Sequence, residues 1–101
     1  MELKRVVVTG LGALTPVGNT MPETWENIKK GVSGAGPITH FDASKFKATF
    51  ACEVKNFNAT EFIDRKEARK MDLYEQYALV AAMEAIKDCG YDIFGVGEMG
   101  I

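Results

Sequence analysis

The chain has 101 residues, of which 47% are hydrophobic and 26% are charged, and its formal net charge is −2. This composition is typical of a globular domain and excludes a whole-chain attraction to nucleic acid. No apolar run approaches a signal-peptide core or the roughly 20 residues that span a bilayer. We therefore expect one cytoplasmic domain over residues 1–101, binding neither nucleic acid nor membrane.

The first two elements are expected within the first 30 residues. Residues 5–9 form a short β-branched run before a glycine, which predicts a buried strand. Thr20 and Glu23 have the spacing of a capping box, with proline between them, so a helix should run from Thr20 to about Lys30. The apolar residues of this helix recur on one face and are expected to face a core: Met21, Trp25, Ile28 and Val32.

The middle of the chain predicts a loop followed by a strand. Residues 31–47 are rich in glycine and small polar residues, which favours a long loop. Residues 48–55 alternate between apolar and polar, so we expect a half-buried strand. Its inward residues would be Phe50, Cys52 and Val54. Asn58 and Glu61 then repeat the capping-box spacing.

A long helix is expected after the charged stretch at residues 64–72. It should end near Cys89, because Gly90 suits a helix stop. Its apolar residues lie almost all the way round, and such a helix belongs inside something larger. The glycines of residues 94–101 resemble the approach to another strand. We therefore expect a chain that is cut short, with this helix covered by a neighbouring copy or by further residues.

The segment Thr9-Gly10-Leu11-Gly12 follows the first predicted strand and invites comparison with a dinucleotide-binding turn. The third glycine of that motif is replaced by Thr15, and no acidic residue lies about 20 positions further on to bind a ribose. A nucleotide site is therefore disfavoured, and no cofactor is expected.

The cysteines and the histidine do not form a recognisable catalytic or metal site. Cys52 and Cys89 lack CxxC spacing, which makes a poor zinc site, and in the cytosol both should stay reduced. Cys89 falls at a helix C-terminus, where the dipole disfavours a thiolate, and Cys52 is expected in the core. His40 lies in a loop with no serine or cysteine fixed beside it.

Four cations form the most informative local pattern: Arg65, Lys66, Arg69 and Lys70. On a helix they fall within about 140°, with Glu67 expected on the opposite side. Such an arc could bind an acidic helical partner or phosphate. The alternative is a solvated helix face supported by Asp64 and Asp72, and the residues alone favour it.

Three stretches in register resemble the β-ketoacyl-acyl carrier protein synthases, especially the type II condensing enzymes of bacterial fatty acid synthesis. Residues 5–19 (RVVVTGLGALTPVGN) resemble the opening of these enzymes, and residues 33–42 (SGAGPITHFD) the loop after their first helix. Residues 65–72 (RKEARKMD), with the Gln-Tyr-Ala that follows at 76–78, are similar to the start of their long third helical stretch. The resemblance runs from about Lys4 to Tyr91.

The resemblance implies an α/β, thiolase-like fold, of which only the first part of the N-terminal βαβαβαββ half is present, in an enzyme that forms a homodimer. In that family a cysteine carries the acyl chain and two histidines assist decarboxylation of malonyl-carrier protein. These residues are expected beyond position 101, so Cys52, Cys89 and His40 inherit no role. The 101 residues alone are expected to be inactive, without metal or cofactor.

One functional element carries over from the family. Its acidic, helical acyl carrier protein, in acyl- and malonyl-loaded forms, docks on basic residues that match Lys66, Arg69 and Lys70, with Arg65 beside them. The parent enzyme would elongate fatty acyl chains by decarboxylative condensation. Two alternatives stay open: a non-catalytic module that only docks a carrier protein, and a folding remnant that self-associates to cover its long apolar helix.

Overall fold

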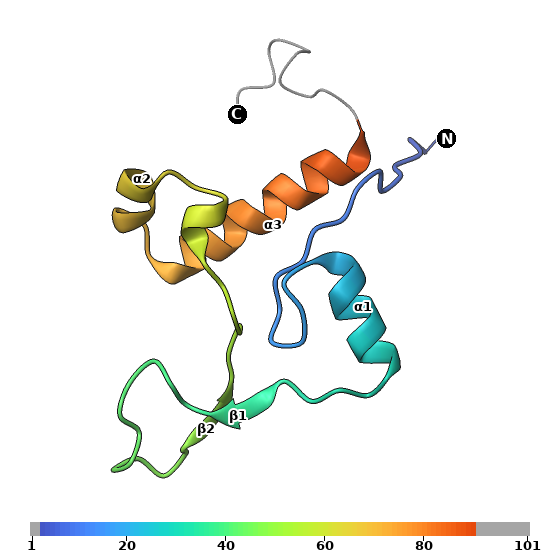
Figure 1. The fold of residues 1–101 in the computed structure, drawn as a ribbon. Coiled ribbons are helices and arrows are strands. Elements are labelled where there is room, and N and C mark those ends of the chain that lie inside the picture. Colours follow the sequence, from blue (N-terminus) through green and yellow to red (C-terminus); the bar gives the residue numbers. More distant parts are fainter. Residues whose placement is uncertain (1–2, 91–101) are drawn as a thin grey trace.

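The computed structural model describes residues 3–90, and its longest element is the helix that leads to Gly90 (Figure 1). The elements in chain order are α1 (Met21–Lys29), β1 (Ala35–Pro37), β2 (Phe50–Cys52), the 3-10 helix η1 (Ala59–Glu61), α2 (Arg65–Arg69) and α3 (Leu73–Cys89). The strand approach predicted in residues 94–101 lies outside the described residues.

Helix α1 begins as its capping signal predicts. The Thr20 hydroxyl accepts a hydrogen bond from the Glu23 backbone N–H at 3.3 Å, which satisfies one of the unpaired donors at the helix start. Most of the apolar stripe expected to face a core is nevertheless exposed. The exposed fraction is 51% for Trp25, 54% for Ile28 and 47% for Val32. The core assignment for this face is wrong for this chain, because burial depends on a covering element that the sequence of the helix does not specify.

The strand predicted at residues 5–9 is also absent from the described structure. Val6 is 89% exposed, and no described segment pairs with its backbone to make a ladder. The chain instead runs beside the C-terminal half of α3 (Figure 1). A Cβ atom on Gly12 would lie 1.9 Å from the Ala81 carbonyl oxygen, and one on Gly10 would lie 2.3 Å from that of Ala85. These glycines therefore allow close backbone packing on α3.

A two-stranded antiparallel hairpin occupies the middle of the chain. Strand β1 lies within the loop predicted at residues 31–47, and Gly36 pairs with Ala51 of β2. The strand predicted at residues 48–55 shortens to Phe50–Cys52, with Ala51 half-buried and both neighbours exposed. The predicted inward direction of Phe50 and Cys52 is therefore wrong. A lone two-stranded ribbon has too little covering structure to bury one face.

The small core lies where η1, α2 and α3 meet. Buried Ile63, Ala68 and Val80 form its centre, and the partly buried residues packed on them are Phe57, Ala59 and Met71. Phe57 also makes an edge-to-face contact with Tyr77, with ring centroids 5.1 Å apart. This cluster fixes α2 against α3, which determines what α2 presents to solvent.

Helix α3 ends as predicted, with Gly90 in the left-handed conformation at φ 73°. The expectation that apolar side chains of this helix are left uncovered in this chain is confirmed. Tyr74 is 70% exposed, and Leu79 and Met83 are also exposed. The Cα radius of gyration is 17.3 Å, against about 13 Å for a compact domain of this length. Within residues 3–90, no helix is long and apolar enough to cross a membrane.

Candidate functional site

Helix α2 is held in one orientation by contacts on its inner side. Ala68 is only 7% exposed and belongs to the core cluster. The Gln76 side-chain amide of α3 donates to the backbone carbonyls of Ala68 at 3.0 Å and Met71 at 3.3 Å. The Ala68 carbonyl also accepts the Met71 N–H at 3.2 Å, and the two bonds from Gln76 tie the end of α2 to α3. The opposite side of α2 therefore faces solvent.

Four cations occupy that solvent side and define the α2 basic surface: Arg65, Lys66, Arg69 and Lys70. All four are exposed, and Lys70 forms the C-cap rather than part of the helix. Neither Asp64 nor Asp72 makes an ion pair within the described part of the chain, although both flank the surface. The support that a solvated helix face would draw from these two acids is therefore missing.

The position predicted for Glu67 is wrong. Its Oε1 lies 3.7 Å from the Lys70 Nζ, so it borders the basic surface instead of lying opposite to it. The physical reason is the spacing of three residues, which brings two side chains to neighbouring positions on a helix. The surface thus contains four cations with one acid at its edge.

Two acids of α3 hold the segment that leads into α1, and sequence reasoning missed both. The Glu84 carboxylate accepts the backbone N–H of Ala13 at 2.9 Å and that of Met21 at 2.9 and 3.1 Å. Asp88 accepts the N–H of Leu11 at 2.9 Å. Their sequence signal is weak: two acids four residues apart in the C-terminal half of a largely apolar helix. They fix residues 11–21 to the same helix that carries α2.

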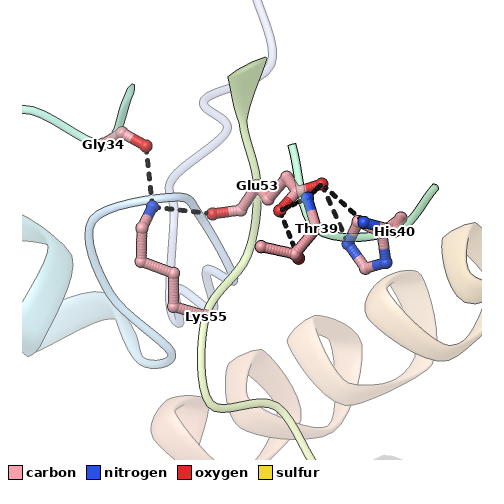
Figure 2. A network of polar contacts seen from close by, with 5 residues as sticks. All are labelled: Gly34, Thr39, His40, Glu53 and Lys55. Carbon is pink, nitrogen blue, oxygen red and sulfur yellow. Dashed lines mark hydrogen bonds and ion pairs between the residues drawn. The ribbon is translucent and has the colours of Figure 1, made fainter. Parts of the chain in front are cut away.

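Glu53 organises the loop that joins β1 to β2 (Figure 2). It accepts hydrogen bonds from the Thr39 hydroxyl at 2.7 Å, the Thr39 N–H and the His40 N–H, and its Oε2 lies 3.6 Å from the His40 Nε2. The Thr39 hydroxyl is the main reason that the pKa of Glu53 lies below its usual value, while desolvation opposes the shift. His40, the histidine weighed as a catalytic candidate, is therefore engaged by a carboxylate.

Lys55 ties three loops together. Its ammonium donates to the backbone carbonyls of Gly34 at 2.7 Å, Glu53 at 2.9 Å and Pro16 at 3.0 Å (Figure 2 shows the first two). An ammonium has three donors, so these bonds use all of them. Lys55 consequently serves the structure and does not offer a free cation to an anionic ligand.

The two thiols lie on different elements of the fold. Cys52 is exposed on β2, which corrects its predicted place in a core. Cys89 lies at the last position of α3, where its thiol donates to the Ile86 carbonyl at 3.0 Å.

Comparison with known proteins agrees with this geometry. Residues 3–96 match the family model described as "Beta-ketoacyl synthase, N-terminal domain". The chain is 54% identical over 90 residues to "3-oxoacyl-[acyl-carrier-protein] synthase 2" of Staphylococcus aureus (strain COL), covering 89% of this chain and 22% of that protein. The protein of the same name from Synechocystis sp. is 53% identical over 88 residues, covering 87% and 21%.

A solved structure shares the fold as well. The chain matches "The ishigamide ketosynthase/chain length factor" with a TM-score of 0.78 and 36% identity, over 84% of this chain and 21% of that one. The chain thus spans about a fifth of the length of the relatives it matches. The resemblance drawn from the three sequence stretches is confirmed, and the chain belongs to the β-ketoacyl synthase family, whose thiolase-like α/β fold it contains in part.

Proposed function

We propose that this chain is the N-terminal portion of a 3-oxoacyl-[acyl-carrier-protein] synthase that elongates fatty acyl chains by decarboxylative condensation with malonyl-acyl carrier protein. The proposal rests on 54% identity to relatives of that name. Within this portion, we assign α2 to docking of the acidic acyl carrier protein. The family also supports a cytoplasmic homodimer as the parent protein.

The observation that carries the docking assignment is the α2 basic surface itself. Its cations share one side of an element whose other side is anchored through Ala68 and Gln76. Cations on an anchored helix attract an acidic partner with less loss of backbone freedom than cations on a mobile segment. Such attraction mainly accelerates encounter and sets orientation, leaving the acyl-loaded arm of the carrier protein to reach a catalytic centre.

The condensation chemistry is assigned to residues outside these 101. The family's acyl-accepting cysteine and its two histidines do not correspond to Cys52, Cys89 or His40. Incubation of the 101-residue chain with acyl-carrier protein should therefore leave its intact mass unchanged. Stoichiometric gain of an acyl group on either cysteine would refute this assignment.

The alternative is a non-catalytic module whose whole activity is to bind a carrier protein. Both readings place binding on α2, but they differ in what else the parent protein does. Purification of the native protein separates them. A species several times heavier than 11.1 kDa that forms one acyl-cysteine supports the condensing enzyme, whereas an 11.1 kDa species that binds carrier protein without acylation supports the module.

Charge reversal tests the docking assignment directly. In one variant Lys66, Arg69 and Lys70 all become Glu. In the matched control three exposed cations elsewhere become Glu: Lys29, Lys30 and Lys45. Both variants change the net charge equally, so a difference between them reports position.

The expected result is a loss of acyl carrier protein binding by at least about tenfold in the α2 variant and a small, salt-sensitive change in the control. Binding would be measured by surface plasmon resonance at low and high salt. Equal losses in the two variants would show that net charge alone governs binding. Unchanged binding in the α2 variant would remove the docking assignment.

A further inference from the structure

Glu67 is an acid at the edge of the α2 basic surface, next to Lys70. Its carboxylate lies 3.7 Å from the Lys70 Nζ, and the two side chains are 63% and 73% exposed. At about 100° per residue, Glu67 lies about 60° from Lys70 around the helix, at the border of the basic arc. The other nearby acids, Asp64 and Asp72, make no ion pair with these cations in the described residues.

An exposed pair of this kind is weak, and a partner can break it. Exposed ion pairs contribute little to stability because water and salt screen them and because two long side chains lose freedom. The pair nevertheless lowers the positive potential at Lys70. An incoming carboxylate must therefore compete with Glu67 for the Lys70 ammonium.

We propose that Glu67 is a specificity-determining residue of the α2 basic surface: it occupies Lys70 in the free chain and is displaced by an acidic carrier protein. This inference rests on the proposed docking function. Glu67 penalises single anions that could engage Lys70 alone. A helix with several acids in register also gains Arg65, Lys66 and Arg69, and so offsets the penalty.

The chain offers a matched control for this inference. Glu26 of α1 forms the same kind of exposed pair, with its Oε1 2.6 Å from the Lys29 Nζ at a spacing of three residues. Glu26→Gln and Glu67→Gln therefore change the same charge in the same local setting, on two different helices. Glutamine has nearly the helix propensity of glutamate, so neither substitution should unfold its helix.

The test measures association of the full 101-residue chain with purified acyl carrier protein by stopped-flow fluorescence. At about 50 mM salt, Glu67→Gln should raise the association rate constant roughly two- to threefold, and the gain should shrink as salt increases. Glu26→Gln should leave it unchanged. Equal gains in the two variants, or no gain in Glu67→Gln, would overturn the inference.

A double-mutant cycle tests whether Glu67 acts through Lys70. In a Lys70→Gln background the gain from Glu67→Gln should fall by more than half, because the ammonium that Glu67 occupies is absent. A gain that persists in full would show direct repulsion of the partner and would overturn the pairing with Lys70.

Failure of this inference is distinguishable from failure of the docking function. If charge reversal of Lys66, Arg69 and Lys70 abolishes binding while Glu67→Gln has no effect, docking stands and the role of Glu67 is wrong. If charge reversal has no effect, both are wrong. Circular dichroism of each variant verifies that the helices are retained.

Discussion

Replacing Glu84 by Gln should detach the start of α1 from α3. The carboxylate accepts backbone N–H groups from Ala13 and Met21, at distances of 2.9 to 3.1 Å. A glutamine side chain keeps one acceptor oxygen and turns an NH₂ group toward the other donor. An amide oxygen in the place of Oε1 can still accept both N–H groups, so the losses are the 2.9 Å bond from the Met21 N–H to Oε2 and the negative charge.

The magnitude follows from the two interactions that are lost. A hydrogen bond to a charged group contributes about 1.5–3 kcal/mol. A negative charge at a helix N-terminus contributes about 0.3–1 kcal/mol, and Met21 is the first residue of α1. Because Glu84 is only half-buried, the lower part of these ranges applies, and we expect about 2 kcal/mol for the substitution.

Amide hydrogen exchange of Met21 and Ala13, followed by nuclear magnetic resonance, measures this loss locally. A loss of about 2 kcal/mol corresponds to roughly 30-fold faster exchange when opening is at equilibrium. Glu75→Gln is the control, since it lies on the same helix and makes no hydrogen bond or ion pair in the described structure. Exchange at Met21 that is equally fast in both variants would refute the role assigned to Glu84.

Three further predictions concern packing, pH and exposed surface. Gly12→Ala should strongly lower the urea concentration at the unfolding midpoint, because the new Cβ would lie 1.9 Å from a backbone oxygen of α3. Gly36→Ala is the control and should leave the midpoint unchanged, because the space around its Cβ is open. Equal midpoints in the two variants would contradict the close packing of Gly12 on α3. The depressed pKa of Glu53 means that its contribution to the hairpin is present above the usual glutamate pKa and is lost as pH falls through the lower folded-state value. Hairpin amide shifts should report that loss, and Glu53→Gln should remove it; an identical pH profile in the variant would contradict this. The exposed apolar side chains of α3 should make the chain self-associate as its concentration rises, which sedimentation velocity measures. The double substitution Tyr74→Glu and Met83→Glu should reduce this self-association. A chain that stays monomeric at all concentrations would contradict the prediction.

Local signals predicted the starts and ends of helices well. Thr20 caps α1 and Gly90 ends α3, because each effect depends on backbone groups within a few residues of it. The four cations of α2 are exposed, as either interpretation of the basic arc requires. The position of Glu67 was predicted wrongly, because the expected arc ignored the side-chain reach that allows its carboxylate to contact Lys70.

Burial could not be predicted locally. Trp25 of α1 and the valines of residues 6–8 have the pattern of core residues, yet they are exposed in this chain. A pattern records which face avoids water, whereas burial requires a second element to cover that face. In a chain that spans about a fifth of its relatives, the two need not agree.

Side-chain contacts between elements of the fold escaped prediction, and most of them join residues far apart in sequence. Glu84 bonds Ala13 across 71 positions, and Lys55 bonds Pro16 across 39. Gln76 reaches back eight residues to Ala68 around the end of α2. No local periodicity encodes such pairs, because they depend on how helices and loops are arranged after the chain has folded.

The most direct test of the account is a titration of ¹⁵N-labelled chain with unlabelled acyl carrier protein, with amide shifts followed by nuclear magnetic resonance. We expect the perturbed amides to cluster on residues 65–70 and the shifts to weaken as salt is raised. Perturbations centred instead on another exposed basic pair, such as Lys29 and Lys30 at the end of α1, or no perturbation at all, would contradict docking on α2.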